Sequence, residues 1–102
     1  MRMKILLATA TLAFGLAGGA QASGLAKAQY LAATCANCHG TNGQAQGSAV
    51  SLAGYDAAKF VQTMKAFASG QREATVMHQL AKGYTDDQIN AMAGFFASQK
   101  AK

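Results

Sequence analysis

Apolar side chains repeat at helical spacing in three segments of this chain. They are Leu25, Ala28, Leu31, Ala32 and Cys35 in the first, Phe60, Val61, Met64, Phe67 and Ala68 in the second, and Ile89, Met92, Ala93 and Phe96 in the third. This spacing puts the apolar positions of each segment on one face of a helix. No segment alternates between apolar and polar residues as a half-buried strand does. The pattern therefore predicts an all-α chain with three main helices.

The ends of the predicted helices carry local signals. The first helix should run from Leu25 into Cys38. Asp56 is placed to cap the second helix, whose body we expect over 59–68, with Gly70 just past its end. Residues 85–88, Thr-Asp-Asp-Gln, form a capping box that begins the third helix. Residues 40–55 are expected to be loops, and residues 71–83 are less regular.

Gly94, beside Phe95 and Phe96, has two interpretations. It favours close contact between the terminal and N-terminal helices, or it is a tolerated weak helix residue. Four aromatic residues are candidates for exposure on the surface: Tyr55, Tyr84, Phe95 and Phe96.

The first 22 residues are typical of a secretory signal peptide. Arg2 and Lys4 precede an uncharged apolar run, and Ala20-Gln21-Ala22 supplies the small-x-small pattern of a cleavage site. We predict cleavage before Ser23 and a periplasmic location for the mature chain, residues 23–102. An uncleaved membrane anchor is the alternative, although the run is short and rich in Ala and Gly for a membrane span.

The mature domain is small. Its 80 residues bury little apolar surface on their own, and domains of this size usually need a disulfide, a metal or another stabilising group. Its seven basic and four acidic side chains give a net charge of +3, which is well below a nucleic-acid-binding footprint. A covalently held apolar cofactor would supply the missing core.

The motif Cys35-Ala36-Asn37-Cys38-His39 is the attachment sequence for c-type haem. Two thiols three residues apart on one helical turn lie on the same side of the backbone and can bind both vinyl groups of one porphyrin. His39 would then be the proximal ligand of the iron. One motif predicts one haem c.

Three other interpretations of the Cys-x-x-Cys pair remain: a thioredoxin-like redox pair, a zinc site and a plain disulfide. The first normally lies in a βαβ unit, which this chain lacks. A zinc site would have to use Cys35, Cys38, His39 and His78, and the adjacent Cys38 and His39 do not easily share one tetrahedral ion. A disulfide leaves His39 without a role.

The sixth iron ligand has four candidates in the mature chain: Met64, Met77, Met92 and His78. Met64 and Met92 fall on apolar helix faces, where a methionine usually fills the core. Met77 lies in the irregular segment between two helices and is the preferred ligand, because a thioether favours ferrous iron and raises the potential. His78 would lower the potential, and its alternative role is that of a solvated loop histidine.

With both axial positions filled by protein, the domain has no catalytic site of its own and should carry electrons through an exposed haem edge. Five cations are candidates for a docking rim or are ordinary solvated side chains: Lys27, Lys59, Lys65, Arg72 and Lys82.

Several stretches resemble class I c-type cytochromes of the small bacterial kind, and in particular the monohaem cytochrome subunit of flavocytochrome c sulfide dehydrogenase. They are LAATCANCHGTNG at 31–43, LAG at 52–54, and the run from Phe60 to Ile89 that contains ATVMHQLAKGYTD at 74–86. The resemblance implies a class I cytochrome c fold, with helices and loops wrapped around one haem. It also implies that Cys35 and Cys38 hold the haem and that His39 and Met77 bind the iron.

The same resemblance implies a periplasmic subunit that takes electrons from an FAD-containing flavoprotein oxidising sulfide. Nothing in the composition or spacing of the chain names sulfide. The alternative is a free monohaem carrier moving between redox complexes, and a weaker one is a haem sensor in which Met77 is absent from the iron or labile.

Overall fold

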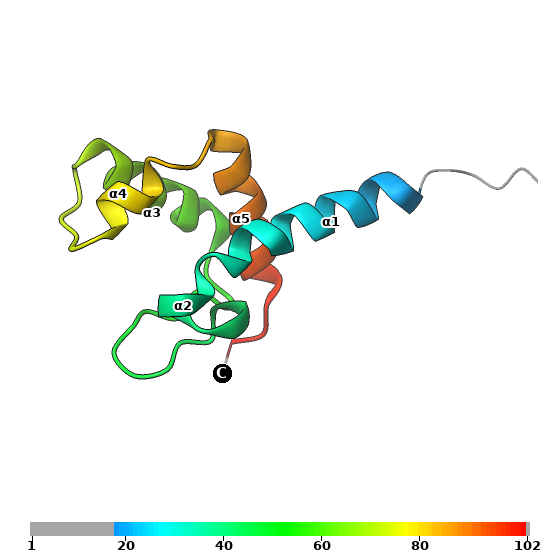
Figure 1. The fold of residues 1–102 in the computed structure, drawn as a ribbon, viewed down its shortest axis with the longest axis horizontal. Helices are drawn as coiled ribbons and strands as arrows, with labels where there is room; N and C mark the ends of the chain where they lie inside the picture. Colours follow the sequence, from blue (N-terminus) through cyan, green and yellow to red (C-terminus); the bar gives the residue numbers. More distant parts are fainter. Residues whose placement is uncertain (1–17, 102) are drawn as a thin grey trace, which may run out of the picture.

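Three long helices carry most of the regular structure. This computed structural model describes residues 18–101, with side chains from residue 24 onward. The long helices are α1 (Gly18–Ala33), α3 (Ala57–Ser69) and α5 (Asp86–Ser98), and the short ones are α2 (Ala36–His39), α4 (Met77–Ala81) and a 3₁₀ turn, η1 (Thr41–Gly43) (Figure 1). The described residues contain no strand. The predicted all-α architecture with three main helices is confirmed.

The first helix ends earlier than the hydrophobic pattern predicts. Helix α1 stops at Ala33, and a turn at Thr34 and Cys35 separates it from α2. The Thr34 hydroxyl donates a hydrogen bond of 2.7 Å to the Leu31 carbonyl oxygen, a local bond that competes with continued helix. The expectation of one helix through Cys38 is therefore wrong.

The N-terminal end of α1 lies in the segment that the sequence predicts to be removed. Helix α1 begins at Gly18 and crosses the expected cleavage site before Ser23. The rest of the predicted signal peptide, residues 1–17, lies outside the described residues. Its cleavage stays a prediction. In the part of the chain that the structure describes, no helix combines the length and apolar character needed to span a bilayer.

Helices α3 and α5 begin as their capping residues predict. The Asp56 carboxylate accepts a 2.9 Å bond from the Lys59 amide, and α3 ends at Gly70 in the left-handed conformation. At α5 both bonds of the capping box form, between the Thr85 hydroxyl and the Gln88 amide and between the Gln88 side chain and the Thr85 amide.

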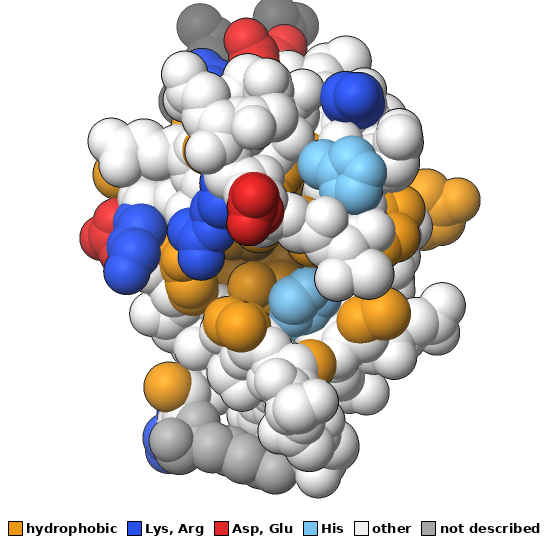
Figure 2. All heavy atoms as spheres, turned by 90° about the vertical axis from the view of Figure 1, so that its left-hand side faces the viewer, with side chains coloured by type: hydrophobic (Ala, Val, Ile, Leu, Met, Phe, Trp, Pro, Cys, Tyr) orange, Lys and Arg blue, Asp and Glu red, His pale blue; other side chains and the backbone are white. Residues whose placement is uncertain are grey.

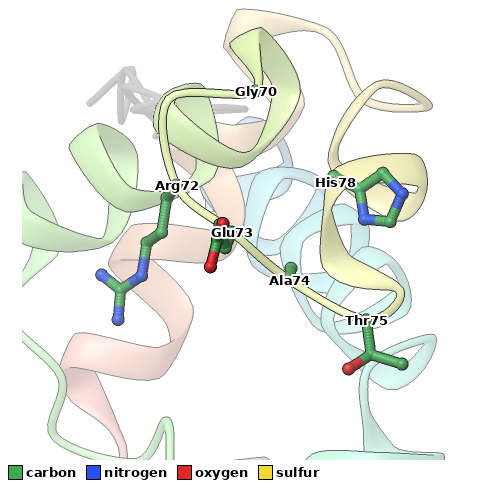
Figure 3. Close-up of a pocket in the computed structure, with 6 residues that line it drawn as sticks. All are labelled: Gly70, Arg72, Glu73, Ala74, Thr75 and His78. Atoms are coloured by element: carbon green, nitrogen blue, oxygen red, sulfur yellow. The ribbon is translucent and has the colours of Figure 1, made fainter.

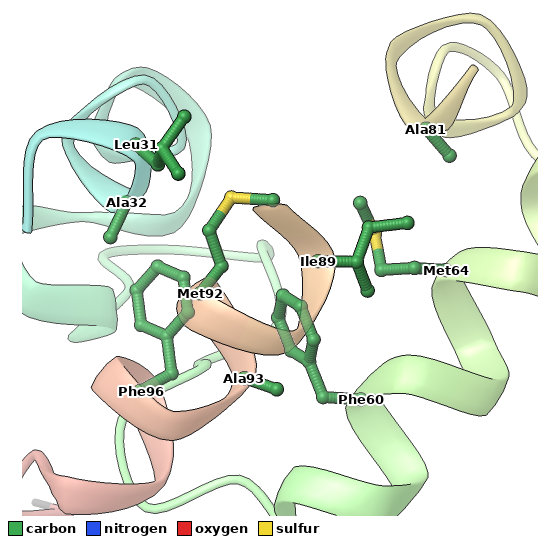
Figure 4. Packing of buried hydrophobic residues seen from close by; sticks show 9 residues of the cluster. All are labelled: Leu31, Ala32, Phe60, Met64, Ala81, Ile89, Met92, Ala93 and Phe96. Atoms are coloured by element: carbon green, nitrogen blue, oxygen red, sulfur yellow. The ribbon is translucent and has the colours of Figure 1, made fainter. Parts of the chain in front are cut away.

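The apolar face of α5 is the centre of the core. Helix α5 packs against both α1 and α3, and its Met92 and Phe96 are almost completely buried. Figure 4 shows these side chains between Leu31 and Ala32 of α1 and Phe60 of α3. Phe96 is therefore a core residue and not an exposed aromatic, and Met92 fills the core as expected. Tyr55, Tyr84 and Phe95 are half-buried.

Close backbone packing occurs at Gly43 and not at Gly94. Gly94 is exposed, and a Cβ placed there would have no heavy atom within 4 Å. A Cβ at Gly43 would lie 2.7 Å from the Ala53 nitrogen and 2.8 Å from Cδ1 of Phe96. Of the two interpretations of Gly94, close contact is therefore wrong and a tolerated helix residue fits, although α1 and α5 do pack against each other through other residues. The loop after the Cys-x-x-Cys-His motif makes the close approach to α5 instead.

Candidate haem site

One cavity is lined by all four residues that the sequence predicts to hold the haem: Cys35, Cys38, His39 and Met77. Its volume of about 350 Å³ lies within the usual range for cofactor pockets. Figure 2 shows hydrophobic side chains gathered around a hollow on one face of the molecule. The cavity is lined by Thr34, Cys35, Cys38, His39, Val50, Leu52, Tyr55, Phe60, Thr63, Met64, Phe67, Arg72, Val76, Met77, Leu80 and Tyr84. Most of this lining is apolar, as a porphyrin requires.

The lining of the cavity comes from segments far apart in the sequence. Cys35 lies in the turn before α2, while Cys38 and His39 belong to α2 itself. Met77 is the first residue of α4, and α4 is held against α3. The fold thus brings the attachment motif and the preferred sixth ligand to one space.

His39 is oriented by a backbone carbonyl. Its Nδ1 lies 2.6 Å from the carbonyl oxygen of Val50. Because a carbonyl can only accept, Nδ1 must carry the proton and donate it. Nε2 of the neutral ring then keeps its lone pair for a metal, the arrangement found for metal-binding histidines. This tautomer fits the proximal ligand of a haem iron.

The loop that supplies Val50 is fixed by Gly43. The Gly43 carbonyl oxygen accepts hydrogen bonds from the Leu52 amide at 2.8 Å and the Ala53 amide at 3.1 Å. These two bonds bring the chain back toward α2, so that Val50 reaches His39. The positive φ of Gly43, 79°, makes this turn accessible to glycine.

Cys35 and Cys38 are both free thiols with different surroundings. Cys38 is exposed and Cys35 is half-buried. Burial raises the pKa of the Cys35 thiol. Both sulfurs line the cavity, so both can be reached by a group that occupies it.

The candidates for the sixth ligand are separated by their positions. Met77 and Met64 line the cavity, while Met92 and His78 do not. Met64 is also a buried member of the core, where it packs with Ile89 and Ala81 (Figure 4). Met77 is half-buried at the cavity wall. Among the four candidates, Met77 combines access to the cavity with a position outside the core.

His78 faces a different part of the surface. Successive residues of a helix point about 100° apart, so His78 cannot share the direction of Met77. It lines a wider, shallower pocket with Gly70, Arg72, Glu73, Ala74 and Thr75, in which the Arg72 and His78 side chains diverge (Figure 3). His78 is half-buried, and its buried Nδ1 has no hydrogen-bond partner among the described residues. His78 therefore lies on a helix and not in a loop as expected, and its side chain is only partly exposed to solvent.

The cavity includes residues that sequence reasoning missed. The Val50 carbonyl has no sequence signal, because any residue could present it. The sequence suggests only an exposed aromatic at Tyr84, yet the Tyr84 hydroxyl lies 2.6 Å from the hydroxyl of Thr34 beside the attachment motif. Of the five cations proposed for a docking rim, all are exposed and only Arg72 lines the cavity. Its guanidinium lies 5.2 Å from the centre of the Phe67 ring.

The geometry does not favour the zinc interpretation. Among residues 24–101, no three His, Cys, Asp or Glu side chains converge on a point where a metal ion could be held by them. An apolar cavity with two thiols, an oriented imidazole and a thioether instead matches the donor set of a c-type haem, whose iron takes His and Met as axial ligands. The fold and this cavity define a haem-binding, helical electron carrier.

Comparison with known proteins gives the family. Residues 24–100 match the cytochrome c family model, and the chain belongs to this family. The cytochrome subunit of sulfide dehydrogenase from Chlorobaculum tepidum is 33% identical over 76 residues, which cover 74% of this chain and 69% of that protein. Cytochrome c-553 of Nitratidesulfovibrio vulgaris is 31% identical over 93% of this chain and 98% of its own length.

The solved structures agree with the expected fold. The structure of cytochrome c4 from Acidithiobacillus ferrooxidans superposes with a TM-score of 0.69 at 28% identity. It covers 74% of this chain, which spans half the length of that protein. The class I cytochrome c fold is therefore confirmed. The chain is an electron-transfer cytochrome that binds one covalently attached haem c.

Proposed function

We propose that residues 23–102 form a periplasmic electron carrier whose haem c is attached through Cys35 and Cys38, with His39 and Met77 as axial ligands. The observation that carries this assignment is the convergence of all four side chains on one apolar cavity. The hydrogen bond from His39 Nδ1 to Val50 supports it further, since it leaves Nε2 free for the iron. The predicted signal peptide, residues 1–22, would deliver the chain to the periplasm.

A haem c supplies one-electron chemistry, and the residues of this chain fix its potential and its access. Met77 would favour the ferrous state, because a thioether is a soft ligand. Together with His39 it fills both axial positions, so substrates cannot bind the iron. The domain therefore has no catalytic site of its own and depends on a partner for chemistry.

We further propose that the partner is an FAD-containing flavoprotein that oxidises sulfide. The similarity to the Chlorobaculum tepidum cytochrome subunit supports this assignment.

The alternative is a free monohaem carrier, and it has support of its own. Cytochrome c-553 matches this chain along nearly the whole length of both proteins. A mobile carrier would use the same exposed haem edge for short-lived encounters. Both functions need the same haem site and differ in how long the partner stays bound.

Purifying the native protein gently from the periplasm distinguishes a bound subunit from a free carrier. Co-elution of flavin in fixed ratio, together with reduction of the haem by sulfide, would establish the subunit. A haem protein that elutes without flavin, and that sulfide does not reduce even after the candidate flavoprotein is added, would be a free carrier.

The intact mass of the same preparation tests processing and attachment. The proposal predicts the mass of residues 23–102 plus one haem. A mass that includes residues 1–22 would contradict the cleavage, and a mass without haem would contradict covalent attachment. Cys35→Ala and Cys38→Ala variants should each lose one thioether bond.

A further inference from the structure

One side-chain hydrogen bond joins two segments of the chain that line the haem cavity. The Tyr84 hydroxyl lies 2.6 Å from the Thr34 hydroxyl, although the two residues are 50 positions apart in the sequence. Tyr84 follows α4, the helix that begins with Met77, while Thr34 immediately precedes Cys35. Both residues line the cavity. The bond thus links the segment that follows the Met77 helix to the segment that precedes the attachment motif.

The direction of this bond follows from the available protons. The Thr34 hydroxyl has one proton and donates it to the Leu31 carbonyl oxygen at 2.7 Å. It can therefore only accept from Tyr84, whose hydroxyl is the donor. The result is a relay from Tyr84 through Thr34 to the backbone of α1. Both hydroxyl protons are used, which favours a single arrangement of the two side chains.

Helix α4 depends on such contacts for its position. It has five residues, far fewer than an isolated helix needs for stability. It packs against α3, whereas α1 packs against α5. Among the described residues, the Tyr84 to Thr34 bond is the only side-chain hydrogen bond from residues 76–84 to residues 34–39.

We propose that Tyr84 and Thr34 are positioning residues that hold the Met77 segment closed over the haem and slow the release of Met77 from the iron. This inference rests on the axial ligation proposed above. Movement of Met77 away from the iron would pull on α4 and on the segment that follows it, and the hydroxyl pair resists that movement. The bond sets how readily the sixth position opens. It contributes no ligand itself.

Imidazole binding to the ferric holoprotein measures this opening, because imidazole must displace Met77 to reach the iron. We expect Tyr84→Phe, which removes only the bond between the two hydroxyls, to raise the apparent imidazole affinity about three- to tenfold, the range for loss of one net hydrogen bond. Thr34→Val also removes the bond to the Leu31 carbonyl oxygen and should raise the affinity at least as much. The double variant should exceed Thr34→Val little, since Tyr84→Phe then removes no further bond. Thr34→Ser keeps the hydroxyl and should behave as the unmodified protein.

The Met77→Ala background separates positioning from a general effect. In that background the sixth position is already open, so Tyr84→Phe should no longer change the imidazole affinity. Tyr30→Phe is the matched control, because Tyr30 is 77% exposed on α1 and does not line the cavity. All variants are compared as fully haem-loaded protein, with the Soret band as the readout.

Two results would overturn the proposal. One is an unchanged imidazole affinity in Tyr84→Phe. The other is an imidazole affinity that Tyr84→Phe raises by the same factor whether Met77 is present or replaced by alanine. That result would mean that the hydroxyl acts on the ligand pocket and not through Met77. If Met77→Ala alone leaves imidazole affinity unchanged, the axial assignment itself fails, and this outcome is distinct from both.

Discussion

Replacing Gly43 with alanine tests how the loop over the haem site is built. The perturbation adds one methyl group at a residue with φ of 79°. The left-handed conformation alone disfavours a non-glycine residue by about 1–2 kcal/mol. The new Cβ would also lie 2.7 Å from the Ala53 nitrogen, 2.8 Å from Cδ1 of Phe96 and 3.0 Å from the Leu52 carbonyl carbon.

These contacts cannot be relieved cheaply. Two of the three atoms belong to the backbone, and Phe96 is fixed in the core at 1% exposure. Overpacking of a filled site typically adds about 1–3 kcal/mol. We therefore expect Gly43→Ala to lower the free energy of unfolding by about 2–5 kcal/mol. A domain of this size has a stability near the lower end of the usual range, so this loss is a large fraction of the total.

Gly47→Ala is the matched control. Gly47 has a similar φ of 72°, but a Cβ there would have no heavy atom within 4 Å. Gly47→Ala should therefore lower the free energy of unfolding only by the cost of the left-handed conformation, about 1–2 kcal/mol. Denaturant unfolding of both holoproteins, followed by far-UV circular dichroism, gives the comparison. Equal losses in the two variants would refute the steric reasoning, because the difference between them is the packing contribution.

The remaining predictions concern the core and a helix end. Phe96→Ala should destabilise the holoprotein by about 3–5 kcal/mol, because it removes a fully buried ring. The assignment of Phe96 to the core would be contradicted if Phe96→Ala lowered the midpoint temperature of thermal unfolding by less than Tyr30→Ala, a change at an exposed residue. Thr85→Ala removes the hydroxyl that caps α5 and should lower the free energy of unfolding by about 1 kcal/mol, whereas Thr85→Ser keeps the hydroxyl and should change it little. Equal melting temperatures for the two would disprove the capping contribution.

Local signals predicted the helices that begin with a capping residue. Asp56 and Thr85 are short-range features, since each satisfies amides within its own first turn. The start of α3 and the start of α5 were therefore readable from the sequence. Helix α4 was not, because five residues are too few to show a period.

Hydrophobic periodicity did not predict the end of α1, because it does not report hydrogen bonds from side chains that compete with the helix. The apolar spacing continues to Cys35, but the Thr34 hydroxyl bonds the Leu31 carbonyl oxygen and the chain turns. The close approach at Gly43 was not predictable from the sequence for a related reason. Whether a glycine permits close approach depends on its neighbours in space, and Gly43 meets Phe96 across more than 50 residues of sequence.

The sequence indicated which side chains make up the candidate site, but not the groups that orient them. Cys35, Cys38, His39 and Met77 were identified by residue type and spacing, and they line one cavity. The partners that orient them were not. The Val50 carbonyl has no residue-specific signal, and the Tyr84 to Thr34 bond needs the tertiary fold.

The central claim is that Met77 completes the iron coordination opposite His39. Proton NMR of the ferrous holoprotein tests it directly, because the ring current of the haem shifts the methyl group of a bound methionine far upfield. We expect such a resonance in the unmodified protein and in Met64→Leu, and its loss in Met77→Ala, which should then bind carbon monoxide. A resonance that survives in Met77→Ala, or disappears only in Met64→Leu, would contradict the claim.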